Sequence, residues 1–157
     1  MVQIVLPSLP PFYPRSENAR SLATFAATCA DKAAEAMADG REDDAQAFAR
    51  GASDAADLAS LLARSARSEW ESHGEAWHIA DDAGRASAPR LRKVADAAEA
   101  EAQSVRESAQ AARRYAIAAA FAATPFAPMA DAEARREARE LADAEARRCA
   151  EIEGGAS

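Results

Sequence analysis

Alanine is the feature that most constrains this chain, because 47 of its 157 residues are alanine. Alanine is the strongest helix former, since its side chain loses no conformational entropy when a helix forms. It also buries little apolar area, so it contributes far less than the roughly 1.5–3 kcal/mol of a buried leucine or phenylalanine. We therefore predict an all-α protein whose helix axes lie near the short end of the usual range of about 8–10 Å.

Prolines and glycines divide the sequence into segments without interrupting a helical pattern. Asp39-Gly40 and Gly84 mark turns, and Pro89 suits the first turn of a helix. The short turns predict an antiparallel four-helix bundle, in which a long hairpin joins the second and third helices and an extended, proline-rich arm precedes the first. The predicted segments are the arm over 1–15, the bundle over 16–153 with helices at about 16–38, 42–83, 89–123 and 131–153, and a frayed C-terminus over 154–157.

Two local features bear on how the first two helices begin and continue. Ser16 is the expected N-cap of the first helix, because a serine side chain accepts a bond from an N–H group in the first turn. Gly74 weakens the second helix, and the sequence leaves open whether the helix breaks there. A break would fold the chain back and shorten the hairpin.

The register of the hairpin follows from the position of its turn. A turn centred near residue 87 places positions whose numbers sum to about 174 at the same level. His73 is then expected opposite Glu101, which needs a partner because it lies on an apolar stripe, and Trp77 is expected opposite residues 97–98. The first and fourth helices should cover the same half of the hairpin and leave about 68–100 uncovered. We expect the arm or another protein to cover that half.

Charge patterning limits the classes of partner. The net charge is −7, but acidic and basic residues alternate, which argues against nucleic acid or an anionic membrane as a partner. Arg90, Arg92 and Lys93 form a basic cluster of the kind that is usually a solvated face. Tyr115–Ala130, the longest uncharged apolar stretch, contains two prolines and is too short for a bilayer span, and no basic leader is visible. We expect a cytoplasmic protein, or part of an assembly formed in the cytoplasm, from a bacterial or phage genome.

One short motif has chemical potential. Glu75 and His78 form Glu-x-x-His, a spacing that di-iron bundles use twice to place carboxylate and imidazole ligands on one helix face. This chain has one copy and only two histidines, so a metal or catalytic centre would have to combine these residues with His73 and Glu101. No nucleophile motif, glycine-rich loop, zinc spacing or calcium loop accompanies them. We therefore assign no cofactor, metal or catalytic residue, and the chain leans toward a non-enzymatic role.

The candidate interaction residues are Phe12, Tyr13, Trp70, His73 and Trp77. The two tryptophans are seven residues apart on one helix face, where they suit either a core or a binding hot spot. The arm docks on its own hairpin, binds a partner as a strand or polyproline ligand, or stays disordered. We expect a helical interaction module (an adaptor, a small inhibitor or immunity-like protein, or an assembly subunit) with a protein partner or self-association.

Two alternatives remain open. The first is the metal-binding or catalytic bundle centred on His73, His78, Glu75 and Glu101. The second is a structural virion or shell component whose arm latches a neighbouring subunit. The first requires the four side chains to converge, and the second requires the arm to leave its own bundle.

Overall fold

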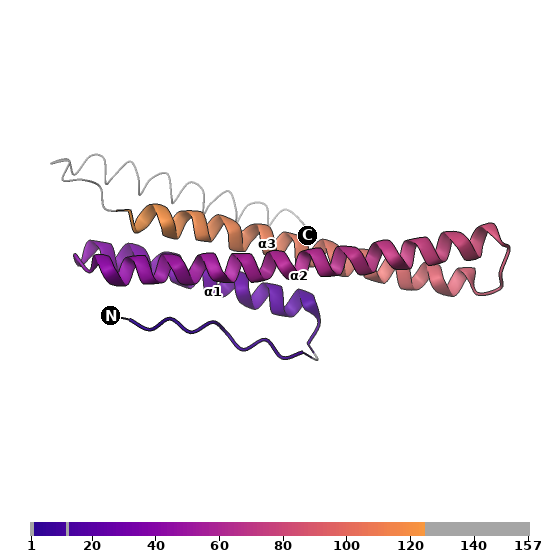
Figure 1. Ribbon diagram of the computed structural model, residues 1–157, viewed down its shortest axis with the longest axis horizontal. Coiled ribbons are helices and arrows are strands. Elements are labelled where there is room, and N and C mark those ends of the chain that lie inside the picture. Colours follow the sequence, from indigo (N-terminus) through magenta and orange to yellow (C-terminus); the bar gives the residue numbers. More distant parts are fainter. Residues whose placement is uncertain (1, 12, 125–157) are drawn as a thin grey trace, which may run out of the picture. The chain divides into compact units, whose positions relative to one another are not determined.

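The computed structural model describes residues 2–11 and 13–124, and these residues form three α-helices and no strand. The helices are α1 (Arg15–Ala38), α2 (Glu42–Asp82) and α3 (Ala88–Ala122) (Figure 1). The all-helical prediction is confirmed, and the predicted bounds of these helices agree with the observed ones to within one residue. None of the three helices combines the length and the apolar composition that a membrane span needs.

The chain divides into two compact units, Met1–Ala123 and Thr124–Ser157, and the first unit contains all three helices. The predicted fourth helix over 131–153 and the predicted frayed end over 154–157 lie outside the described residues. The four-helix bundle is therefore not confirmed.

The turns after α1 and α2 have the same structure. Gly40 and Gly84 adopt φ values of +73° and +60°, in the left-handed region that glycine enters without steric penalty. At the first turn the Arg41 N–H donates to the Ala36 carbonyl over 2.8 Å, and the Gly40 N–H donates to Met37 over 3.1 Å. This pair of bonds is the Schellman motif, and it recurs at Gly84. Each glycine therefore ends its helix where the sequence predicts.

Gly74 does not interrupt α2, which continues as one helix of 41 residues. The hairpin of α2 and α3 is consequently as long as the unbroken pattern predicts, and the chain does not fold back at this position. Figure 1 shows this hairpin extending beyond the start of α1.

The core of the described unit consists almost entirely of alanine. Leu22 and Val105 are the largest fully buried side chains. Cys29 is also buried, and its burial raises the pKa of the thiol. Because alanine is small, the helices approach closely but gain little free energy from each buried residue.

The N-terminal arm lies against its own helices. The Val2 N–H donates to Asp44 Oδ1 over 3.0 Å. The hydrogen bond from Arg41 and, to a smaller degree, this bond from Val2 lower the pKa of the Asp44 carboxyl. At the other end of the arm, the Asn18 side-chain amide donates to the Pro10 carbonyl over 3.2 Å. The arm therefore runs back from the start of α1 toward the start of α2 (Figure 1).

Ile4 holds the middle of the arm in place. A Cβ atom added at Gly51 would lie 2.6 Å from Ile4 Cγ2 and 3.6 Å from Cys29 Sγ, so the isoleucine occupies the space that the glycine leaves beside α1. The arm thus covers the half of α2 that α1 also covers. Of the two expected covers for residues 68–100, the arm is therefore wrong, because the turn through Pro10 and Tyr13 reverses the chain before α1 begins, and the other, a protein partner, stays a prediction.

Replacing Gly51 by alanine is expected to displace Ile4 and loosen the arm. Within a helix, Gly→Ala gains up to about 1 kcal/mol of stability, and Gly74→Ala is the matched control because its added Cβ meets no atom within 4 Å. Urea unfolding should show that Gly74→Ala gains about 0.5–1 kcal/mol while Gly51→Ala gains less or loses stability. Hydrogen exchange over residues 2–9 should rise only in Gly51→Ala. Equal stabilisation with an equally protected arm would contradict this packing.

Candidate functional site at the projecting end of the hairpin

The register between α2 and α3 determines which residues of the two helices lie at the same level of the hairpin. The Arg92 guanidinium lies 5.4 Å from the centre of the Trp77 ring, and Arg113 Nη1 lies 3.6 Å from Asp57 Oδ1. Positions whose numbers sum to about 170 therefore lie level, because the turn between Asp82 and Ala88 is centred near residue 85. Trp77 lies beside Arg92, so the expectation that it faces residues 97–98 is wrong.

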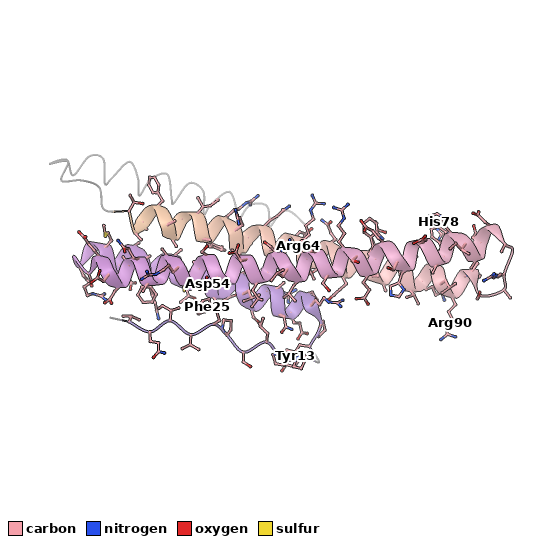
Figure 2. The ribbon with its side chains drawn as sticks, in the orientation of Figure 1. Tyr13, Phe25, Asp54, Arg64, His78 and Arg90 are labelled. Carbon is pink, nitrogen blue, oxygen red and sulfur yellow. The ribbon has the colours of Figure 1, made fainter. Side chains whose placement is uncertain are left out.

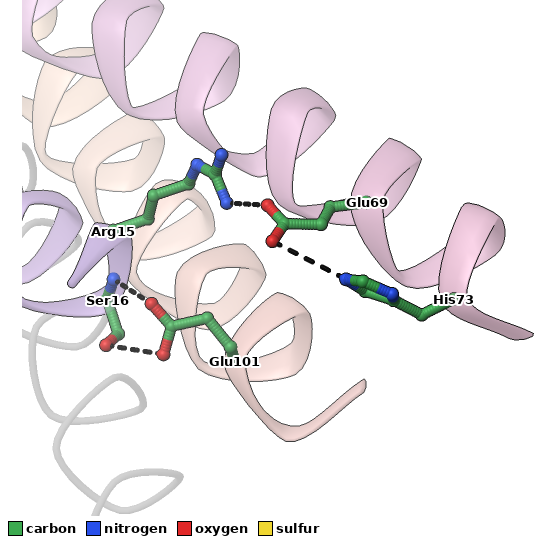
Figure 3. A network of polar contacts seen from close by, with 5 residues as sticks. All are labelled: Arg15, Ser16, Glu69, His73 and Glu101. Carbon is green, nitrogen blue, oxygen red and sulfur yellow. Dashed lines mark hydrogen bonds and ion pairs between the residues drawn. The ribbon is translucent and has the colours of Figure 1, made fainter. Parts of the chain in front are cut away.

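Glu101 binds the start of α1. Its carboxylate accepts two bonds of 2.8 Å, one from the Ser16 N–H and one from the Ser16 hydroxyl (Figure 3). The next two N–H groups, of Glu17 and Asn18, donate to the Pro14 carbonyl, so Glu101 satisfies a donor that the helix itself leaves open. A carboxylate here also lies at the positive end of the helix dipole.

Ser16 is therefore not the N-cap. The helix begins at Arg15 with Pro14 as the capping residue, and no side chain of its own caps it. The capping carboxylate comes from a different helix, 85 residues along the chain, which a local pattern does not reveal.

Glu69 occupies the level of Glu101 on the neighbouring helix. It pairs with Arg15, and His73 Nε2 lies 3.7 Å from its carboxylate (Figure 3). The hydrogen bond from Arg15, reinforced by the charge of that guanidinium, lowers the pKa of the Glu69 carboxyl. The predicted pair of His73 with Glu101 is wrong, since the observed register moves Glu101 to the level of Glu69.

Beyond these two glutamates the hairpin continues without α1. We name residues 70–82 of α2 and 88–100 of α3 the projecting end (Figure 1). None of the three buried clusters of the described residues contains a residue between 67 and 101. The buried side chains of the projecting end are three alanines, Ala80, Ala88 and Ala95. Two helices whose fully buried contacts are alanines leave much of their apolar area without cover.

The surface that receives α1 continues as an apolar strip. Glu69 and Glu101 contact the start of α1, and one heptad further out the same faces carry Ala76 and Val94. Val94 is 40% exposed, and Ile79, three residues after Ala76, is 55% exposed. The strip therefore has the character of a helix-binding surface that no described helix occupies.

The predicted interaction residues divide between two places. Trp70, His73 and Trp77 are half-buried on the projecting end, where the Trp77 and His78 rings lie 4.4 Å apart. Tyr13 is exposed at the turn of the arm, and Phe12 lies outside the described residues. The structure thus brings the α2 residues together and keeps them apart from the arm.

Charges on the projecting end are partly separated: its α2 half carries acids and no lysine or arginine, whereas its α3 half is basic at residues 90–93 and acidic at Asp96 and Glu99. From Ser68 to Gly84 there are five acidic residues and no lysine or arginine, whereas 85–95 holds four basic residues and no acid. Among the described residues, no ion pair within 4.0 Å involves Glu75, Asp82 or Arg90. Figure 2 shows His78 and Arg90 directed to opposite sides of the projecting end.

The four residues of the alternative metal or catalytic centre do not converge. Glu101 binds Ser16, His73 lies beside Glu69, and both Glu75 and His78 are exposed. Within the described part of the chain, no group of three or more His, Cys, Asp or Glu side chains is placed to hold a metal ion. The geometry therefore gives acid–base or metal chemistry no assembled site in this region.

The contact between Ser16 and Glu101 is expected to stabilise the fold. Glu101→Ala should lower the free energy of unfolding by about 1–2 kcal/mol, and Ser16→Ala by about 0.5–1 kcal/mol. The double variant should lose less than the sum, because the two groups act on each other. Urea unfolding of the three variants measures this coupling. The exposed Glu99→Ala is the control, and a Glu101→Ala effect no larger than that of Glu99→Ala would contradict the assignment.

Comparison with protein-family models, curated proteins and solved structures gave no match to this chain. Among the described residues, the projecting end is the part of the hairpin whose apolar surface no other helix covers.

Proposed function

We propose that this chain is a non-enzymatic protein-interaction module that binds a protein partner through the projecting end. The observation that carries the proposal is the apolar strip of Ala76, Ile79 and Val94, which extends the α1-binding surface beyond α1. A helix laid on this strip would bury the apolar area that two alanine-packed helices leave open. Trp70 and Trp77 are also half-buried on the projecting end, and tryptophan is common in binding hot spots.

The position of the arm narrows the proposal. The sequence suggested that the arm and the Trp70–His78 region act together, but the arm packs beside Gly51 and Asp44 at the other end of α2. We assign to the arm the role of stabilising the bundle and to the projecting end the role of binding. A virion or shell subunit with a latching arm would require Ile4 to leave its place at Gly51.

The proposal also retains the finer expectations from the sequence. These are an antiparallel four-helix bundle completed by a helix over 131–153, a cytoplasmic setting, and a protein partner in place of nucleic acid or membrane. Interleaved charge along the whole chain supports the last point. Adaptor, small inhibitor or immunity-like protein, and assembly subunit all fit this description.

Site-specific photocrosslinking tests the proposal. Benzoylphenylalanine replaces Ile79 in one variant and Leu61 in the control, since both side chains lie on α2 and are similarly exposed, at 55% and 52%. In cells that naturally make the protein, irradiation should yield a defined protein adduct from position 79 and little from position 61. No adduct at position 79, or equal adducts at both positions, would reject the projecting end as the binding surface.

A further inference from the structure

Resting on the proposed function, we infer that the partner of the projecting end is the same end of a second copy, docked antiparallel about a two-fold axis. The inference depends on how charge is distributed over the two helices. In an isologous interface each surface must complement itself, and few surfaces do so by chance.

The charges oppose the local preference of the helices. Asp81 and Asp82 lie in the last turn of α2, near the negative end of the helix dipole, and Arg90 lies near the positive start of α3. Neither the last turn of α2 nor the first turn of α3 contains a residue of the favourable sign. Of these charges, Arg90 is the one that the arrangement proposed below would pair with an acid of a partner.

A two-fold axis places the acidic helix of one copy on the basic start of α3 of the other. If the two ends overlap until each tip reaches the level of Glu69 in its partner, residues near 77 lie on the axis. Residues of the two α2 helices that lie level across the axis then have numbers that sum to about 154. Arg90 is level with residue 80 of its own α2. It therefore comes opposite residue 74 of the second copy, next to Glu75 of that copy. By symmetry, this ion pair forms twice in the dimer.

The same overlap closes the apolar strip. Val94 is level with residue 76 and comes opposite residue 78 of the second copy, which is next to Ile79. The start of α1 would stop the second copy from sliding further along the hairpin. Arg15 and Ser16 are bound to Glu69 and Glu101 there, so the tip of the second copy would meet α1. Apolar contact and ion pairing thus favour one register.

The expected dimer is weak. The overlap is about 20 Å long at the usual helical rise, so it buries roughly 400 Å² per copy. That area is about half of the roughly 800 Å² per partner in a stable complex. We therefore expect a dissociation constant of the order of 10–100 µM and a dimer that weakens as salt rises.

Charge reversal separates this inference from a folding effect. One variant carries Glu75→Lys and the other carries Arg90→Glu, in the full-length protein. Neither change breaks an ion pair within the described chain, and Arg90→Glu improves the match to the dipole of α3, so the Tm of each variant should stay unchanged or rise. Sedimentation equilibrium should nevertheless show that each variant alone dimerises at least about tenfold more weakly than the wild type.

Mixing the two variants supplies the decisive comparison. In an equimolar mixture, or in one chain with both substitutions, acid again meets base, and association should return to the wild-type strength. A wild type that stays monomeric at about 0.5 mM, or variants that associate as strongly as the wild type, would overturn the inference. The photocrosslinking test distinguishes this failure from a failure of the proposed function. If the adduct at position 79 contains a different protein, the binding role stands and self-association is rejected. If position 79 gives no adduct, the binding role and self-association are both rejected.

Discussion

Close approach of three helices through alanine is the constraint on which the described structure depends. Alanine lets the helix axes come together, but each buried residue contributes little free energy. Larger side chains such as Leu22 and Val105 are rare in this core. Stability must therefore come from long seams and from contacts at the helix ends.

Those contacts lie at the two ends of α1. At its start, Glu69 and Glu101 hold Arg15 and Ser16. Toward its other end, the arm lies against the bundle with Ile4 beside Gly51 and Cys29. Both sets of contacts fix where α1 sits on the hairpin, and they also fix how much of the hairpin remains beyond it.

Element bounds were predictable from the sequence because glycine and proline act locally. Gly40 and Gly84 end helices through their positive φ, and Pro89 suits a first turn. The need of Glu101 for a polar partner was also predictable, since it lies on an apolar stripe. The identity of that partner was not, because moving the turn centre from 87 to 85 shifts level positions by four residues, slightly more than one helical turn.

The direction of the arm was the other feature that the sequence did not predict. Its composition separates it from the helices, but its direction depends on a turn through Pro10 and Tyr13 and on a methyl group that fits beside Gly51. Neither feature has a periodic signal. The place of Glu69 beside Arg15 was also missed, although it follows Leu62, which packs against the core, by seven residues, a spacing that keeps a residue on the same helix face.

None of the described residues outside the hairpin covers the projecting end, and hydrogen–deuterium exchange of dilute protein tests this most directly. Local opening depends on how much apolar contact holds a segment. Amides of 70–82 and 88–100 should exchange faster than those of 45–66 and 102–119, and they should slow when protein concentration rises. Equal protection of both halves in dilute protein would contradict the account.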